Sequence, residues 1–149
     1  MKIPISKTAP SAPFRSATIE LQPQFYDVDP MGVVWHGNYF RFLECARSAL
    51  LDSFHYGYLE MEKSGYFWPI VETRMKYVSP VALGQKITVT AILVEWENRL
   101  RIDYEIFNLA TRRRATKAQT TQIAIDKHSR EMCFTSPAIL FEKLGLSQK

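Results

Sequence analysis

The chain has 149 residues, of which 46% are hydrophobic and 23% are charged, and its formal net charge at pH 7 is +4. This length fits one compact domain, which buries a sizeable core without disulfides or a structural metal. The composition is that of an ordinary globular protein. The modest positive charge favours an anionic ligand such as a nucleotide phosphate, and it does not require a nucleic acid.

The chain carries no targeting or membrane-spanning pattern. Residues 1–15 contain three prolines and no apolar run long enough for a signal peptide, so we expect a flexible N-terminal arm there. A single domain is predicted over residues 16–149. No run of about 18 apolar residues occurs, so no transmembrane helix is expected. Cys45 and Cys133 are too few and too far apart for a disulfide framework, which predicts a cytoplasmic protein with reduced cysteines.

The predicted elements follow in chain order. Ile19 and Leu21 alternate with polar neighbours and predict a strand over residues 16–25. After a stretch rich in turn residues, apolar side chains recur at helical spacing and predict a long, largely buried helix over residues 39–56. A connecting segment over residues 57–65 comes next. Four further strands are predicted over residues 67–77, 85–96, 100–109 and 114–126, followed by a short helix over 137–144.

One strand, one long buried helix and four consecutive strands form an α+β pattern. The predicted sheet is too large for a single helix to cover one face and leave the other soluble. We therefore expect the second face of the sheet to pack against another copy of the chain.

The most distinctive segment is YDVDPMGVVWHGNY, residues 26–39. Asp27 and Asp29 lie two residues apart, just before a glycine-bearing turn that leads into the helix. The free N–H groups of a helix N-terminus stabilise a developing oxyanion, and a nearby carboxylate attacks an acyl carbon or activates water. Gly32 allows the backbone to approach a ligand. An Asp before a helix is also a common N-cap, and residue chemistry alone favours capping.

The segment DVDPMGVVWHGNYF, followed by Glu44 and Arg47, resembles the signature of the 4-hydroxybenzoyl-CoA thioesterase family. It is also similar to the acyl-CoA thioesterases associated with the Tol-Pal system. The later YVSPVALGQ, residues 77–85, resembles the family's segment ahead of its long hairpin, and the whole resemblance covers about residues 16–127. It implies a hotdog fold, an antiparallel sheet wrapped around one long central helix. It further implies a homodimer with one continuous sheet, often paired into a tetramer, and an active site at the dimer interface.

The resemblance also implies roles for individual residues. It assigns the catalytic carboxylate to Asp29 and the oxyanion donor to the backbone N–H of His36, rather than to the histidine ring. It leaves open whether Asp29 is a nucleophile or a general base. Asp27 fits a structural role in the turn, and Glu44 is expected to pair with Arg47 or a neighbouring strand.

Substrate-binding candidates come from the same segment and from a basic cluster. Trp35 and Tyr39 are predicted pocket walls, and Asn38 either bonds in the site or caps the helix. The cluster around Arg112 and Arg114 is either a solvated hairpin end or a site for the phosphates of CoA. It lacks the interleaved aromatics and recognition helix of a nucleic-acid site.

Neither a metal nor a separate cofactor is expected. His55 and His128 have no Cys, His or acidic residue at metal-ligand spacing. The sequence has no Gly-rich phosphate loop, so coenzyme A enters only as part of the substrate.

The sequence thus predicts an enzyme that hydrolyses acyl-CoA to a free acid and CoA. One alternative is a thioesterase for acyl groups on acyl carrier protein, which would then be a partner. Another is a non-catalytic acyl-CoA-binding hotdog protein, which would not need Asp29. A hotdog dehydratase is a third, and the D-x-D context resembles it less. The acyl group itself is not indicated by the sequence.

Overall fold

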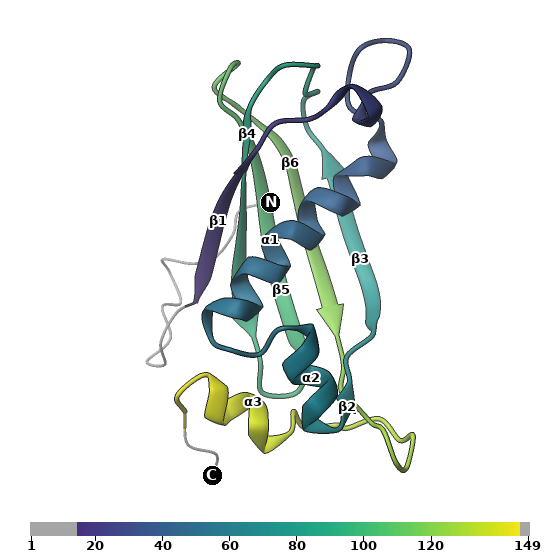
Figure 1. Cartoon of the computed structure of the whole chain (residues 1–149), viewed down its shortest axis with the longest axis vertical. Helices are drawn as coiled ribbons and strands as arrows, with labels where there is room; N and C mark the ends of the chain where they lie inside the picture. Colours follow the sequence, from purple (N-terminus) through teal and green to yellow (C-terminus); the bar gives the residue numbers. More distant parts are fainter. Residues whose placement is uncertain (1–14, 147–149) are drawn as a thin grey trace.

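The computed structural model describes residues 15–146, so the predicted N-terminal arm lies almost entirely outside the described range. A five-stranded antiparallel sheet curves around one long helix, α1 (Tyr39–Ser53), as Figure 1 shows. The strand order is β1-β4-β5-β6-β3. The strands are β1 (Ser16–Leu21), β3 (Ile70–Tyr77), β4 (Ile87–Glu95), β5 (Leu100–Asn108) and β6 (Arg113–Gln122). The α+β prediction is confirmed.

Smaller elements close the lower end of the sheet in Figure 1, opposite the start of α1. They are the helices α2 (Tyr58–Ser64) and α3 (Ala138–Lys143) and the paired strands β2 (Tyr66–Phe67) and β7 (Ile125–Asp126). At the upper end, the chain between β1 and α1 forms two 3-10 turns, Phe25–Asp27 and His36–Asn38.

The element boundaries differ from the prediction in three places. Helix α2 occupies the predicted connecting segment, and it ends at Gly65, whose φ of +93° suits a residue without a side chain. The strand predicted over residues 67–77 is divided between β2 and β3 at Pro69, which has no N–H to donate to a sheet. The strand predicted over residues 114–126 is divided between β6 and β7.

The core lies between α1 and the concave face of the sheet. The inward side of the helix presents Phe42, Leu43, Ala46 and Leu50, each at most 2% exposed. Small and aromatic residues alternate across the strands beneath it, in the row Ala91, Tyr104 and Ala118. Burial raises the pKa of Tyr104 to about 12, so its hydroxyl stays protonated and shares a hydrogen bond with Thr120 (2.8 Å).

The convex face of the sheet is polar. Its side chains pair across the strands: the hydroxyls of Thr18 and Thr90 lie 2.9 Å apart, and Gln119 donates to Asp103 at 2.6 Å. Packing of this face against another copy of the chain stays a prediction. One edge of the sheet is β3, where all eight residues except Met75 are exposed.

Replacing Leu50 by Ala should lower the free energy of unfolding by about 2–5 kcal/mol, because the side chain is fully buried and the helix cannot collapse into the space. Urea denaturation measures the change. Leu59, which is 73% exposed on α2, provides the matched control, and Leu59→Ala should change stability by less than about 0.5 kcal/mol. Equal losses in the two variants would contradict this description of the core.

Candidate functional site

The loop between β1 and α1 closes on itself around Asp29. The Asp29 side chain accepts a hydrogen bond from the N–H of Met31 (2.9 Å), and its backbone bonds to Gly32 and Val33. Gly32 has a φ of +81°, a conformation that glycine adopts without strain. A Cβ there would meet nothing within 4 Å, so the turn, rather than a close approach, requires the glycine. Asp29 is half-buried, and only one of its carboxylate oxygens is bonded to a described residue.

Asp27 holds this loop in place and is 1% exposed. One carboxylate oxygen pairs with Arg41 (2.5 Å), and the other accepts from the N–H of Gln24 (2.7 Å). Its carbonyl oxygen accepts from the N–H of Trp35 (3.0 Å) and from the side-chain amide of Asn38 (2.7 Å). Asp27 therefore has the predicted structural role. Asn38 does not cap α1 with its side chain and instead ties the helix start to the loop.

The two segments that carry the family resemblance lie side by side. Val34 donates to the carbonyl of Val81 (2.8 Å), and Leu83 donates to the carbonyl of Gly32 (3.1 Å). An antiparallel bridge joins Val33 to Ala82. The loop that carries Asp29 is thus fixed to the connection between β3 and β4.

An open pocket of about 320 Å³ lies where these segments meet. Asp29 and His36 both line it. His36 and Gly37 are the first two residues of a 3-10 turn, so their N–H groups have no acceptor within that turn. No other residue between 15 and 146 accepts a hydrogen bond from either group. The pocket therefore combines a partly free carboxylate with the unpaired backbone N–H of His36. Its lining residues are Asp29, Val33, Val34, His36, Tyr39, Tyr77, Val78, Ser79 and Pro80.

Tyr39 lines the pocket as predicted, and Tyr77 lines it although sequence reasoning did not select it. The two rings meet edge to face at 5.2 Å. Burial raises the pKa of both phenols, so both remain protonated at neutral pH. The sequence does contain a signal for Tyr77, because Tyr77 is the first residue of the segment YVSPVALGQ, which resembles the family.

Trp35 lies beside the pocket rather than in its wall. Its ring is 49% exposed and lies 4.9 Å from the ring of His36. It also covers Gly37, where a Cβ would lie only 2.1 Å from the indole. Glycine is therefore required at position 37 if the indole is to keep this place.

The predicted phosphate-binding arginines lie outside the pocket, around the hairpin between β5 and β6. The guanidinium of Arg114 is paired with Glu105, whereas Arg112 is exposed and bonded by its side chain to no described residue. The hairpin is nevertheless attached to the pocket wall, because the hydroxyl of Ser79 donates to the carbonyl of Arg114 (2.7 Å).

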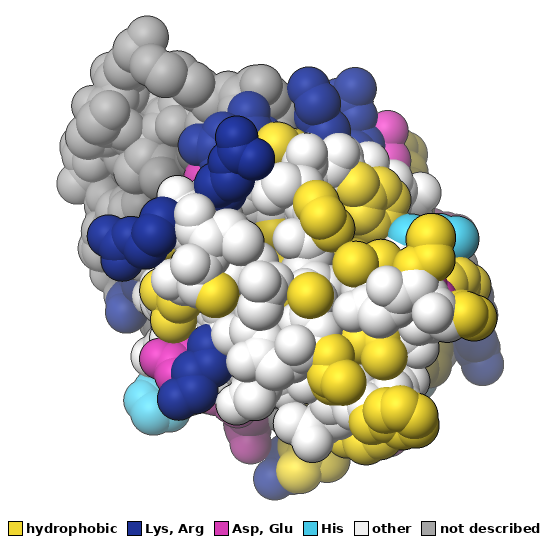
Figure 2. Space-filling view, turned by 90° about the horizontal axis from the view of Figure 1, so that it is seen from above, with side chains coloured by type: hydrophobic (Ala, Val, Ile, Leu, Met, Phe, Trp, Pro, Cys, Tyr) yellow, Lys and Arg dark blue, Asp and Glu magenta, His cyan; other side chains and the backbone are white. Residues whose placement is uncertain are grey.

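Seen from above, the upper end of the molecule has two unlike sides. Hydrophobic side chains gather over one side, and most of the Lys and Arg side chains lie towards the other (Figure 2). Exposed hydrophobic residues in or next to the pocket segments are Met31 (81%), Trp35 (49%), Val78 (50%) and Leu83 (48%). This end of the molecule therefore suits a ligand that has both an apolar part and an anionic part.

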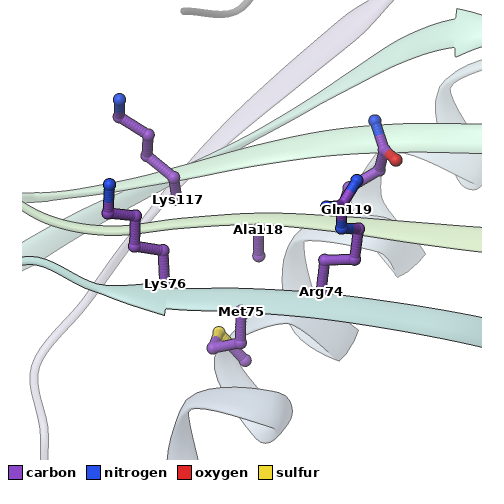
Figure 3. Close-up of a pocket in the computed structure, with 6 residues that line it drawn as sticks. All are labelled: Arg74, Met75, Lys76, Lys117, Ala118 and Gln119. Atoms are coloured by element: carbon purple, nitrogen blue, oxygen red, sulfur yellow. The ribbon is translucent and has the colours of Figure 1, made fainter. Parts of the chain in front are cut away.

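A second hollow, of about 300 Å³, lies along the β3 edge of the sheet. Arg74, Lys76, Lys117 and Gln119 project from one face of β3 and β6, while Met75 projects from the other, as Figure 3 shows. It shares no residue with the Asp29 pocket, and three of its six lining residues are basic.

Comparison with known proteins identifies the family. The sequence pattern of the thioesterase-like superfamily matches residues 23–142. The chain belongs to the thioesterase-like superfamily. The predicted class, an enzyme that hydrolyses thioesters, is confirmed at the level of this family.

Two relatives and one solved structure illustrate the thioesterase similarity. YneP of Bacillus subtilis, which carries the name of a proposed acyl-CoA thioesterase, is 30% identical over 111 residues, or 74% of this chain and 80% of YneP. The chloroplastic acyl-acyl carrier protein thioesterase ATL3 of Arabidopsis thaliana is 29% identical over 113 residues, 75% of this chain and 60% of ATL3. The DHNA-CoA thioesterase from Staphylococcus aureus superposes with a TM-score of 0.72 at 27% identity, over 80% of each chain. The predicted hotdog fold is confirmed.

Two further observations concern the described residues. No helix between residues 15 and 146 is long and apolar enough to cross a membrane. Within the same range, no three His, Cys, Asp or Glu side chains converge to hold a metal ion. The absence of a cofactor and a cytoplasmic location stay predictions.

Asn38→Ala should destabilise the thioesterase fold by about 1 kcal/mol, because it removes one of two hydrogen bonds to the buried Asp27 carbonyl. Chemical denaturation measures the loss. Asn98→Ala, at an exposed turn between β4 and β5, is the control and should leave the midpoint unchanged. If the two variants unfold alike, the bond from Asn38 does not hold the loop.

Proposed function

We propose that this chain hydrolyses acyl-CoA thioesters at the Asp29 pocket. The observation that carries the proposal is the meeting of a partly free carboxylate with the unpaired N–H of His36 in one pocket. The N–H would bind the thioester oxygen as negative charge develops on it, which lowers the barrier for addition to the carbonyl carbon. Asp29 would supply either the nucleophile or the base that activates water.

The acyl-CoA substrate is supported by both surfaces at this end of the molecule. The apolar residues beside the pocket suit an acyl chain, and the exposed Arg112 suits a phosphate of CoA. Arg114 is the weaker candidate for phosphate binding, since Glu105 already occupies its guanidinium. The names of YneP and of the Staphylococcus aureus structure agree with a CoA thioester.

Acyl carrier protein is a second candidate carrier of the acyl group. The relative from Arabidopsis thaliana is named for that substrate, and the basic hairpin around Arg112 would suit an acidic partner. Hydrolysis rates with matched acyl-CoA and acyl carrier protein thioesters separate the two. A protein that binds acyl-CoA without releasing thiol would support the non-catalytic alternative.

Asp29→Asn should reduce the rate of thiol release from acyl-CoA by about a hundredfold or more, because it removes the reacting carboxylate. The amide oxygen of Asn can still accept the hydrogen bond from Met31, so the turn should keep its shape. Thiol release is followed with a thiol-reactive dye over a panel of aromatic, short and long acyl-CoAs.

Asp126→Asn is the matched control for the Asp29 variant. Asp126 also accepts backbone hydrogen bonds, from His128 and Ser129, but it lies on β7, which pairs with β2 at the opposite end of the sheet. This variant should hydrolyse the panel at the wild-type rate. Full activity of Asp29→Asn would remove Asp29 from the mechanism. A single turnover in H₂¹⁸O that labels the protein would identify Asp29 as the nucleophile, since the label enters the carboxylate only when water opens a mixed anhydride at the Asp29 carbonyl carbon.

We also propose that two copies of the chain pair through β3. This strand is an unpaired edge of eight residues, and such an edge readily pairs with another strand. Its convex side presents Glu72, Arg74 and Lys76. An antiparallel pairing about a twofold axis near Arg74 would place Glu72 of one copy opposite a basic residue of the other, which favours the pair. A further pairing of dimers into tetramers stays a prediction.

Sedimentation equilibrium should therefore give about twice the mass of one 17.3 kDa chain. Val71→Lys should weaken the association, because it places a charge on an apolar, 54% exposed residue of the β3 edge. Leu59→Lys, on the exposed side of α2, should leave the mass of the assembly unchanged. A monomeric wild type, or a Val71→Lys variant that associates as the wild type does, would refute pairing through β3.

A further inference from the structure

Tyr77 makes a contact that links the sheet to the proposed oxyanion donor. Its hydroxyl donates a hydrogen bond to the backbone carbonyl of His36 at 2.7 Å. The two residues are 41 positions apart, and they come from different elements, since Tyr77 ends β3 and His36 starts the 3-10 turn before α1. Among the described residues, this is the one side-chain hydrogen bond that joins β3 to that turn.

The bonded carbonyl belongs to the turn that would bind the thioester oxygen. His36 is exposed, and Gly37 after it has the freest backbone of any residue type. The peptide between them lies in the short 3-10 turn and carries the N–H of Gly37. A hydrogen bond to its carbonyl fixes this peptide plane and restricts the backbone of His36 beside it, which is the pre-organisation that oxyanion binding requires.

The ring of Tyr77 is held independently of its hydroxyl. It packs edge to face on the buried Tyr39 at 5.2 Å and lies 6.3 Å from the ring of His36. Burial raises the pKa of Tyr77, so the hydroxyl keeps its proton and remains a donor throughout the neutral range. The hydroxyl can thus be removed while the ring stays in place.

We propose that Tyr77 is a positioning residue, whose hydroxyl holds the carbonyl of His36 and so fixes the backbone of the turn whose N–H would bind the thioester oxygen. This inference rests on the proposed thioester hydrolysis at Asp29. Tyr77 itself exchanges no proton or bond with the substrate. Because it ends the edge strand β3, its hydroxyl also connects the geometry of the turn to the position of that strand.

Tyr77→Phe tests the proposal, because it removes the hydroxyl oxygen alone. We expect kcat for acyl-CoA hydrolysis to fall about tenfold, the usual scale for losing one well-placed hydrogen bond, while KM changes by less than about twofold. Tyr66→Phe is the matched control, since Tyr66 lies on β2 at the far end of the sheet and should keep wild-type kinetics.

The amide resonance of Gly37 provides a readout that does not depend on activity. Its nitrogen is bonded to the His36 carbonyl carbon, so losing the hydrogen bond from Tyr77 should shift its ¹⁵N signal. Tyr66→Phe should leave that signal in place. An unmoved Gly37 signal in Tyr77→Phe would overturn the proposal.

The kinetic outcomes are equally distinct. An unchanged kcat would overturn the positioning role, and a raised KM with wild-type kcat would show that the hydroxyl contacts substrate instead. A fall in kcat that follows a matching loss of thermal stability would assign Tyr77 a purely structural role. If the wild type hydrolyses no thioester at all, the proposed function itself fails, whereas an active wild type with an equally active Tyr77→Phe refutes only this inference.

Discussion

The carbonyl oxygen of Asp27 accepts two hydrogen bonds, and the position of the candidate site depends on them. One comes from the N–H of Trp35 and the other from the side chain of Asn38, so the loop that carries Asp29 is drawn against the turn that carries His36. The Asp27 side chain is itself held in place, because Arg41 and the N–H of Gln24 bond to its two carboxylate oxygens. Buried Asp27 therefore sets the distance between Asp29 and His36, the two residues of the proposed chemistry.

Helix α1 stabilises the fold along its length and leads from the candidate site at its start. Along its length, the helix buries apolar side chains against the concave face of the sheet, and this packing supplies the stability of the domain. At its start, the helix is preceded by a short 3-10 turn with unpaired N–H groups. The convex face of the sheet contributes to neither, since its polar side chains satisfy one another across the strands.

The long elements could be predicted because their apolar periodicity is strong, and α1, which spans Tyr39–Ser53, matches the helix predicted over about residues 39–56. Helix α2 was missed because seven residues carry too little periodicity, and the break at Pro69 because the apolar pattern continues through it. The D-x-D segment indicated the site through resemblance. The contact between Tyr77 and His36 could not be read from the sequence, since it depends on how β3 meets the turn. The pairing of Arg114 with Glu105 likewise follows from the register of the β5–β6 hairpin.

The exposure of Trp35 has an optical consequence. The chain contains three tryptophans, and Trp68 and Trp96 are each only 7% exposed, whereas Trp35 is 49% exposed at the rim of the pocket. An indole in contact with water emits at longer wavelength than one in a core, so the red part of the protein's fluorescence comes mainly from Trp35. A soluble quencher reaches this ring first, and any molecule that settles over the pocket would shield it. The intrinsic fluorescence of Trp35 should therefore report binding at the pocket.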